Sequence, residues 1–392
     1  MPVFGTKRAS VAVLIVTQIA VLSLWFSSAA VLPEMAREAG LSAARLAWLS
    51  TAVQLGFGAG ALVYAVLGFA DRYDPRRVFM LSTFAAAAAN LALLAAPIGG
   101  WEAVSLRTLT GAAMAGVYPV AMKIATGWGK TDRALLIGLL VGALTIGSAS
   151  PHLISFIGGA EWRLTIWAST GLAAAGGVAI LTVGLGPYHA TASRLDVTAV
   201  ALIWTDRRIR LAVIGYIGHM WELYAFWAWV AVFATGSYTL AGTADAGGLG
   251  KLTAFAAIAL GGLACVPAGW LADRIGRAQV AQFCLIASGG AALASAALYG
   301  GPAWLMMGVL IVWGIAIIPD SALYSTLVAD AAPPERAGSL LTLQNALGFL
   351  LTAMTVQIAP ALAALIGWPW VLAIMSLGPA LGIRAMRLLM RG

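Results

Sequence analysis

Three charged side chains, Arg107, Glu222 and Asp320, lie inside long apolar runs of this sequence. Moving a charged group from water into hydrocarbon is unfavourable, so such residues normally face protein or a water-filled cavity and mark a path for ions or solutes. A buried carboxylate or guanidinium can bind a solute of opposite charge, hold helices together, or take part in proton exchange. We therefore expect these three side chains to face an interior rather than lipid.

Glu222 is the best placed of the three for proton exchange. It lies about 11 residues into its apolar run, about 16 Å from the nearer surface, which is close to the middle of a bilayer. His219 is one helical turn away, and imidazole titrates near neutral pH, so it is a candidate partner or proton acceptor. The structural alternatives are a permanent pairing of Glu222 with an arginine, and a purely structural role for His219.

Arg107 and Asp320 remain candidates for proton coupling beside Glu222 and His219. Arg107 lies about six residues inside its run, about 9 Å from the outer end, so its side chain is long enough to reach back to the surface. Asp320 follows Pro319, where a carboxylate can accept backbone N–H groups freed around the proline.

Other polar and aromatic side chains in the apolar runs are candidates for lining a solute cavity. Each is weak evidence by itself, because Ser, Asn and Gln also join helices to one another. The candidates are Trp25, Ser27, Ser28, Gln54, Tyr118, Phe226, Trp229, Trp313, Tyr324, Gln344 and Asn345.

The composition predicts an all-α membrane protein. Hydrophobic residues make up 61% of the chain and charged residues only 10%, and the apolar runs are continuous for about 20 residues, as helical spans require. The net charge of +8 forms no basic patch of the kind that binds nucleic acid. Cys265 and Cys284 lie inside apolar runs, so we expect no disulfide, no metal site and no cofactor.

Twelve apolar runs are candidate transmembrane helices. Basic residues are concentrated in every second interval between them, which predicts that both termini are cytoplasmic; the intervals predicted to be outside contain only Arg37, Arg45, Arg163 and Lys251. The runs are roughly 11–33, 46–67, 78–98, 101–123, 134–157, 163–185, 211–235, 249–271, 279–299, 302–325, 338–362 and 368–388.

The two halves of the chain repeat one another. Residues 67–77 are an imperfect copy of 269–277, and Pro119 and Pro319 interrupt the fourth and tenth runs, in both cases with a separation of about 200 residues. The longest polar interval separates the halves. We therefore predict a six-helix bundle over 1–186, a cytoplasmic linker over 187–210 and a second six-helix bundle over 211–392.

The repeated charged turns are candidates for a conformational latch. The carboxylate of Asp273 can accept hydrogen bonds at the start of a neighbouring helix, around Thr131 to Ala134, and this contact can break and re-form. The alternative is that the turn residues only set membrane topology. The latch candidates are Gly269, Asp273, Arg274, Gly276, Arg277, Asp71 and Arg72.

The whole chain resembles the major facilitator superfamily. Gly269 to Arg277 matches the loop signature G-x-L-A-D-R-x-G-R-K/R, whereas the first-half copy departs from it at Leu67 and Asp74. Arg107 and Gly111 match the helix-four signature, in which the family's arginine is often tied to proton coupling. Gly138 and Gly142 match part of the helix-five antiporter signature, but Ala143 replaces its proline.

The resemblance implies the twelve-helix major facilitator fold, with a solute site near the midplane between two pseudo-symmetric halves. It implies a secondary transporter that works by alternating access, and we expect coupling to protons. We expect a monomer in a bacterial inner membrane that moves a small organic solute. Proton-driven efflux of drugs or amphipathic metabolites is the main alternative, and a transporter-derived sensor or a membrane enzyme is the alternative from another class.

Overall fold

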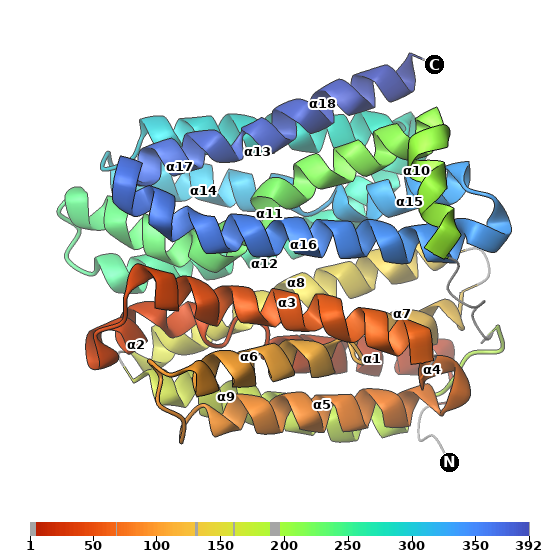
Figure 1. The fold of residues 1–392 in the computed structure, drawn as a ribbon, viewed down its shortest axis with the longest axis horizontal. Coiled ribbons are helices and arrows are strands. Elements are labelled where there is room, and N and C mark those ends of the chain that lie inside the picture. Colours follow the sequence, from red (N-terminus) through yellow and green to blue (C-terminus); the bar gives the residue numbers. More distant parts are fainter. Residues whose placement is uncertain (1–4, 68, 130–131, 160, 189–196, 392) are drawn as a thin grey trace. The chain divides into compact units, whose positions relative to one another are not determined.

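The chain is folded into helices that form two compact units (Figure 1). The computed structural model describes residues 5–67, 69–129, 132–159, 161–188 and 197–391. Unit 1 is Met1–Ala192 and unit 2 is Ser193–Gly392. The predicted linker 187–210 includes the boundary between them, but its residues 189–196 lie outside the described part. The division at 186 and 211 therefore stays a prediction.

Unit 1 carries the first half of the chain. Its helices begin at recognisable caps; for example, the Asp74 carboxylate accepts the backbone N–H of Arg76 at 2.9 Å where α5 begins. The elements are α1 (Lys7–Leu22), η1 (Ala29–Val31), α2 (Leu32–Ala39), α3 (Ala43–Leu67), α4 (Phe69–Arg72), α5 (Pro75–Ala92), α6 (Trp101–Met114), α7 (Tyr118–Thr126), α8 (Arg133–Gly158), α9 (Trp162–Ala179) and η2 (Ile180–Thr182).

Unit 2 carries the second half. Its longest helix, α11, begins at Arg207, because the Asp206 carboxylate caps it by accepting the N–H groups of Arg208 and Ile209 at 2.8 and 3.0 Å. The elements are η3 (Val197–Val200), α10 (Ala201–Thr205), α11 (Arg207–Leu240), α12 (Ala246–Ile275), α13 (Arg277–Ala297), α14 (Ala303–Ile317), α15 (Ser321–Ala331), α16 (Pro334–Ile366), α17 (Trp368–Met375) and α18 (Leu377–Met390).

Within the described ranges, nine helical segments are long and apolar enough to span a membrane. They include all six spans predicted for the second half and the second, fifth and sixth of the first half. The predicted spans 11–33 and 101–123 are broken into shorter helices. The predicted span 78–98 corresponds to α5, whose mean hydropathy is lowered by Arg76 and Arg77 at its start.

The first predicted span is broken where a continuous helix was expected. Helix α1 ends at Leu22, and tight turns join it to η1, with the N–H groups of Leu24 and Trp25 bonded only three residues back. The fourth and tenth spans are broken at their prolines, as predicted: Pro119 lies in the first turn of α7, and Pro319 lies between α14 and α15.

Within each unit, a glycine allows two helices to approach closely. A Cβ atom on Gly111 of α6 would lie 2.0 Å from the carbonyl oxygen of Val53 in α3. A Cβ atom on Gly314 of α14 would lie 2.2 Å from the carbonyl oxygen of Ala257 in α12. The two glycines are about 200 residues apart, so this helix contact follows the same internal repeat as the sequence.

Helix α11 is the central helix of unit 2. It packs against α12, α15, α16 and α18. In its most apolar 18-residue stretch, 72% of the residues are buried, a larger share than in any other span of the described residues. Polar side chains in the middle of α11, such as His219 and Glu222, are therefore buried inside unit 2.

Candidate functional site

His219 and Glu222 occupy neighbouring turns of α11, and both side chains are completely buried. Positions three or four residues apart share a helix face, which places Phe226 on the same side one turn further along. The ring of Phe226 packs against that of Trp313 with centroids 4.7 Å apart. His219, Glu222 and Phe226 thus lie on one buried face of α11.

The Glu222 carboxylate accepts hydrogen bonds from two other helices. Ser288 Oγ of α13 lies 2.6 Å from Glu222 Oε1, and Trp313 Nε1 of α14 lies 2.9 Å from Oε2. Both donors are electrically neutral. Their hydrogen bonds fix the orientation of the carboxyl group. Neither donor is a cation, so these contacts do not neutralise a negative charge on Glu222.

Asp320 occupies the break between α14 and α15 and is also buried. Its Oδ2 accepts a hydrogen bond from Tyr324 Oη at 3.0 Å, and its Oδ1 lies 2.9 Å from His219 Nδ1. The structural alternative, in which this carboxylate accepts backbone N–H groups freed around Pro319, is not seen at the start of α15, where the Asp320 side chain makes no capping hydrogen bond. The carboxylate turns toward α11 instead.

The contact between His219 and Asp320 is close, but its angle is not that of a hydrogen bond. Within the described residues, neither ring nitrogen of His219 has a hydrogen-bond partner. The 2.9 Å separation is attractive when the imidazole is protonated and the carboxylate is ionised.

Aromatic rings surround this pair. The ring centroids of His219 and Tyr324 are 5.7 Å apart, and the ring of Tyr216 lies 6.2 Å from His219 and 6.3 Å from Tyr324. Tyr216 Oη donates to Asn345 Oδ1 at 3.2 Å, which links the cluster to α16. Gly215 leaves room for the Tyr324 ring, since a Cβ atom there would lie 2.7 Å from Tyr324 Cε1.

Arg107 lies at the centre of a buried polar network in unit 1. Its Nη1 donates to Ser27 Oγ at 3.1 Å and to Asn90 Oδ1 at 3.0 Å. Its guanidinium also donates to the carbonyl oxygens of Leu24 at 3.2 Å and Trp25 at 2.6 Å, where the first span is broken. The side chain is only 1% exposed, so it points inward and does not reach back to the surface.

Asn90 of α5 extends this network to a third helix, α9. Its amide nitrogen donates to Thr170 Oγ1 at 3.0 Å, and its oxygen also accepts from Ser27 Oγ at 2.7 Å. All four hydrogen-bond acceptors of Arg107 are neutral. Asn90 and Ser288 were not among the residues predicted from the sequence; the signal for Asn90 was a lone amide in the alanine-rich run 78–98.

The structure places the remaining cavity candidates in several environments. Trp25, Ser27, Ser28, Gln54, Phe226, Trp229, Trp313, Tyr324 and Gln344 are buried, Tyr118 is half-buried, and Asn345 is exposed. Trp229 Nε1 donates to the carbonyl oxygen of Val356 at 3.0 Å. Arg107, Trp25 and Ser27 come together in unit 1. Glu222, His219, Asp320, Phe226, Trp313 and Tyr324 come together in unit 2.

The latch candidates of the second half extend from the last two turns of α12 to the first residue of α13. Asp273 and Arg274 are exposed, and Gly276 adopts a positive φ of 104°. Arg274 stacks on the ring of Trp270, with 3.5 Å between the guanidinium carbon and the ring centroid. Arg277, in contrast, forms an ion pair with Asp330 of α15, so one of the predicted latch cations has a partner in its own unit.

The latch itself stays a prediction. Thr131 lies outside the described residues, as do the side chains of Arg133 and Ala134. In the first-half copy of the turn, Arg72 is exposed, whereas the side chain of Asp71 is outside the described part.

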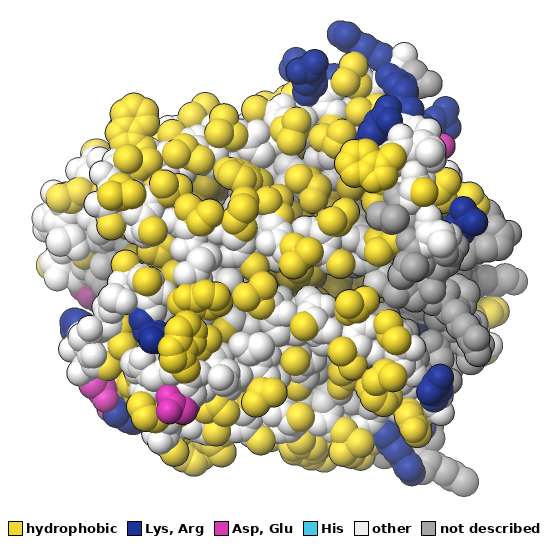
Figure 2. Space-filling view, viewed as in Figure 1, with side chains coloured by type: hydrophobic (Ala, Val, Ile, Leu, Met, Phe, Trp, Pro, Cys, Tyr) yellow, Lys and Arg dark blue, Asp and Glu magenta, His cyan; other side chains and the backbone are white. Residues whose placement is uncertain are grey.

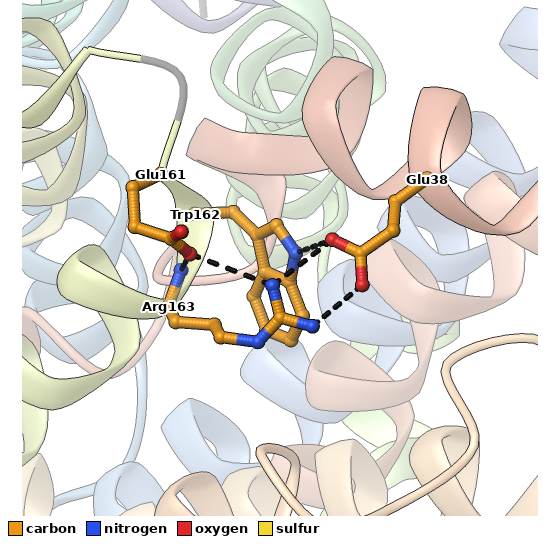
Figure 3. Close-up of polar contacts among 4 residues, drawn as sticks. All are labelled: Glu38, Glu161, Trp162 and Arg163. Carbon is orange, nitrogen blue, oxygen red and sulfur yellow. Dashed lines mark hydrogen bonds and ion pairs between the residues drawn. The ribbon is translucent and has the colours of Figure 1, made fainter.

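A cluster of charged and aromatic residues joins α2 to the start of α9 (Figure 3). Glu38 accepts hydrogen bonds from both terminal nitrogens of Arg163, at 2.5 and 3.0 Å, and from Trp162 Nε1 at 2.6 Å. Arg163 also lies over the Trp162 ring and pairs with Glu161. The hydrogen bonds from Arg163 and then Trp162 lower the pKa of Glu38 below its ordinary value of 4.5.

Apolar spanning helices with buried ionisable side chains define a multi-pass membrane protein with polar sites inside its bundles. No group of three or more potential metal ligands occurs among the described residues. Residues 13–356 match the family described as Major Facilitator Superfamily. The chain belongs to this superfamily and is a secondary transporter.

Solved transporter structures share the fold at low sequence identity. A crystal structure of a mutant of the nucleoside transporter NupG is 14% identical, with a TM-score of 0.74 over 98% of this chain and 100% of that one. The D-xylose-proton symporter is 13% identical, with a TM-score of 0.75 over 98% and 97% of the two chains. A bacterial homolog to the human lysosomal transporter Spinster, inward-facing and unoccupied, is 13% identical, with a TM-score of 0.75 over 99% and 98%.

No curated protein matches the chain. The structural likeness shows the fold alone, so the transported solute must be sought from the chemistry of this chain.

Proposed function

We propose that the protein is a proton-coupled transporter of a small organic solute and that Glu222 carries the coupled proton. The observation that supports this most directly is the burial of Glu222 with only neutral hydrogen-bond donors, Ser288 and Trp313. A buried carboxylate without a cation is strongly disfavoured when ionised. Glu222 is therefore expected to bind a proton while it is enclosed and to release it when water reaches it.

Asp320 and His219 supply a second pair of titratable groups on the same unit. Their 2.9 Å contact is attractive in the charged state, and the hydroxyl of Tyr324 holds the carboxylate in place. We assign this pair the role of a proton-dependent contact between α11 and the short segment that joins α14 to α15. A change of protonation there would alter how tightly the two segments are held.

Coupling requires that proton affinity differ between conformations of the transporter. A proton that binds one conformation more tightly shifts the equilibrium toward it, and by reciprocity solute binding changes proton affinity. The two buried sites of unit 2 provide groups on which such a difference can act. The direction of transport then depends on which conformation the solute favours, so uptake and efflux are both open to this arrangement.

The test begins by finding a solute. A thermal-shift screen of the purified protein against metabolites and drugs identifies compounds that bind the folded state. Nucleosides and D-xylose belong in the first panel, because they are named for the transporters of similar fold.

The decisive experiment compares Glu222→Gln with Glu102→Gln in proteoliposomes. Glu102 is exposed in the first turn of α6, so its substitution makes the same chemical change outside the proposed site. We expect Glu222→Gln to bind and exchange solute but to lose accumulation driven by a pH gradient, whereas Glu102→Gln keeps both. Undiminished gradient-driven accumulation in Glu222→Gln would remove this residue from the coupling mechanism.

A further inference from the structure

Arginines of unit 2 gather where α11 begins and α18 ends. The side chain of Arg207 donates from Nη2 to the carbonyl oxygen of Leu388 at 2.9 Å, which brings the two helix ends together. In Figure 2, dark blue side chains cluster around the end of α18. We call this set the basic cluster; Arg210 in it is half-buried and the others are exposed: Arg207, Arg208, Arg210, Arg384, Arg387 and Arg391.

Acidic residues that are close in the sequence do not neutralise the charge of the basic cluster. Asp206 is the only acidic residue in 197–210 and 377–391. Its carboxylate already accepts the N–H groups of Arg208 and Ile209 as the cap of α11. The cluster therefore presents excess positive charge to whatever covers it.

The exposed face of α18 changes from apolar to basic along its length. Leu377 and Leu381 are 60% and 49% exposed, and they are followed on the same helical face by Arg384 and Leu388. Figure 2 shows a largely hydrophobic surface over α16, α17 and α18 up to the dark blue side chains. Such a stripe matches the two parts of a phospholipid, with hydrocarbon beside the leucines and a headgroup beside the arginines.

Trp204 adds an exposed aromatic side chain beside Arg210 of the basic cluster. It is 72% exposed, and its carbonyl oxygen accepts a hydrogen bond at 2.8 Å from Arg210. Its helix, α10, is packed against the unit through Ile203, which is buried with Ile209 and Leu340. Tryptophan is enriched at the boundary between hydrocarbon and headgroups, so α10 is placed to lie at that boundary.

We propose that the basic cluster binds the headgroup of an anionic phospholipid whose acyl chains lie along Leu377 and Leu381. Guanidinium groups bind phosphate oxygens through paired hydrogen bonds, which explains why arginines rather than general polarity would select this headgroup. The bound lipid would connect α10, α11 and α18. The alternative is that these arginines only set membrane topology. In that case, removing arginines from the basic cluster should affect lipid binding no more than removing arginines elsewhere on the protein.

The test compares two double variants of the full-length protein that remove the same charge. Arg384→Gln with Arg387→Gln removes two arginines of the cluster. Arg8→Gln with Arg77→Gln removes two exposed arginines of unit 1 and serves as the matched control. Thermal midpoints are measured in detergent while phosphatidylglycerol or phosphatidylcholine is titrated in.

We expect phosphatidylglycerol, but not phosphatidylcholine, to raise the midpoint of the unaltered protein and of the control. The phosphatidylglycerol concentration needed for half of this rise should be ~30-fold higher for the cluster variant, since each arginine near a charged lipid surface contributes a factor of about five. Native mass spectrometry should show fewer phosphatidylglycerol molecules bound to the folded cluster variant. Equal lipid responses in the two double variants would overturn the proposal.

Two further measurements keep the result unambiguous. If the double cluster variant does not fold, the single variant Arg391→Gln at the end of α18 replaces it, with an expected ~5-fold effect. Soluble pyrophosphate serves as a headgroup without acyl chains. A midpoint rise from pyrophosphate at the same or lower concentration than phosphatidylglycerol would show a free-phosphate site and overturn the assignment to lipid.

Discussion

The guanidinium of Arg107 donates a hydrogen bond to the backbone carbonyl oxygen of Trp25 at 2.6 Å. Helix α6 thereby supplies a hydrogen bond to a backbone carbonyl group that is left without a helical partner where the first span is broken. In hydrocarbon such a group has no water to bond to, so leaving it unpaired is unfavourable by several kcal/mol. Arg107 is thus a structural part of this break whether or not it also takes part in proton coupling.

Substitution of Arg107 by lysine should destabilise unit 1. Lysine keeps the charge but cannot reproduce the planar set of donors that reaches Ser27, Asn90 and two carbonyl groups at once. We expect the thermal midpoint to fall, with a loss of about 3–5 kcal/mol if the lysine fails to replace these contacts. A midpoint within error of the unaltered protein would show that the network does not depend on the arginine.

Gly314→Ala should disturb the contact between α12 and α14. The added methyl group would meet the backbone of Ala257 at 2.2 Å, so the helices must separate, at a cost of about 1–3 kcal/mol. Gly308 on the same helix has no atom within 4 Å of the corresponding position and provides the control. Thermal unfolding of Gly308→Ala should occur at or above the temperature of the unaltered protein, and a similar fall in both variants would contradict the packing argument.

The Glu38 contact should stabilise the protein at neutral pH and weaken in acid. Its pKa is lowered in the folded protein by Arg163 and Trp162, so the ionised form favours folding. That contribution is fully present above the ordinary pKa near 4.5 and is lost as pH falls through the lower, folded-state value. The difference in thermal midpoint between the unaltered protein and Glu38→Gln should therefore shrink as pH is lowered through this range. A constant difference would contradict the assignment.

Tyr324→Phe should distinguish the contribution of the His219–Asp320 pair to proton coupling from that of Glu222. It removes the hydroxyl that donates to Asp320 while keeping the ring beside His219. Asp320 then loses a hydrogen bond of about 0.5–1.5 kcal/mol in its protonated form and of about 1.5–3 kcal/mol in its ionised form. Because the ionised form loses more, the pH dependence of gradient-driven transport should shift without loss of solute exchange. An unchanged pH profile would confine coupling to Glu222, and loss of exchange would point to a role of Tyr324 in solute binding.

Much of the fold was predictable because membrane spans occur in the sequence as long apolar runs. Pro119 and Pro319 marked two of the breaks correctly, since proline cannot supply the backbone N–H that a continuous helix needs. The break after Leu22 carries no such signal. Its turns are held by Arg107 and Asn90, which lie far away in sequence, and local patterns contain no information about such contacts.

The site was predictable to the level of helix faces but not of partners. Burial of Glu222, Asp320 and Arg107 followed from the unfavourable transfer of charge into hydrocarbon. The pairing of His219 with Asp320 rather than Glu222 depends on the direction taken by the chain at the break before α15. Ser288 was missed because a serine among alanines and glycines fits a helix contact as well as a polar site.

The break in the first span also has a consequence for the order of synthesis. The carbonyl groups of Leu24 and Trp25 accept hydrogen bonds from Arg107, which is synthesised about 80 residues later. The amino-terminal part of a chain folds first during synthesis. During that interval we expect residues 11–33 to insert as one unbroken helix, because hydrocarbon tolerates no unpaired carbonyl. The turn would then form only after α6 has entered the membrane, so the final shape of the first helix is a late step of biogenesis and is set by a later part of the chain.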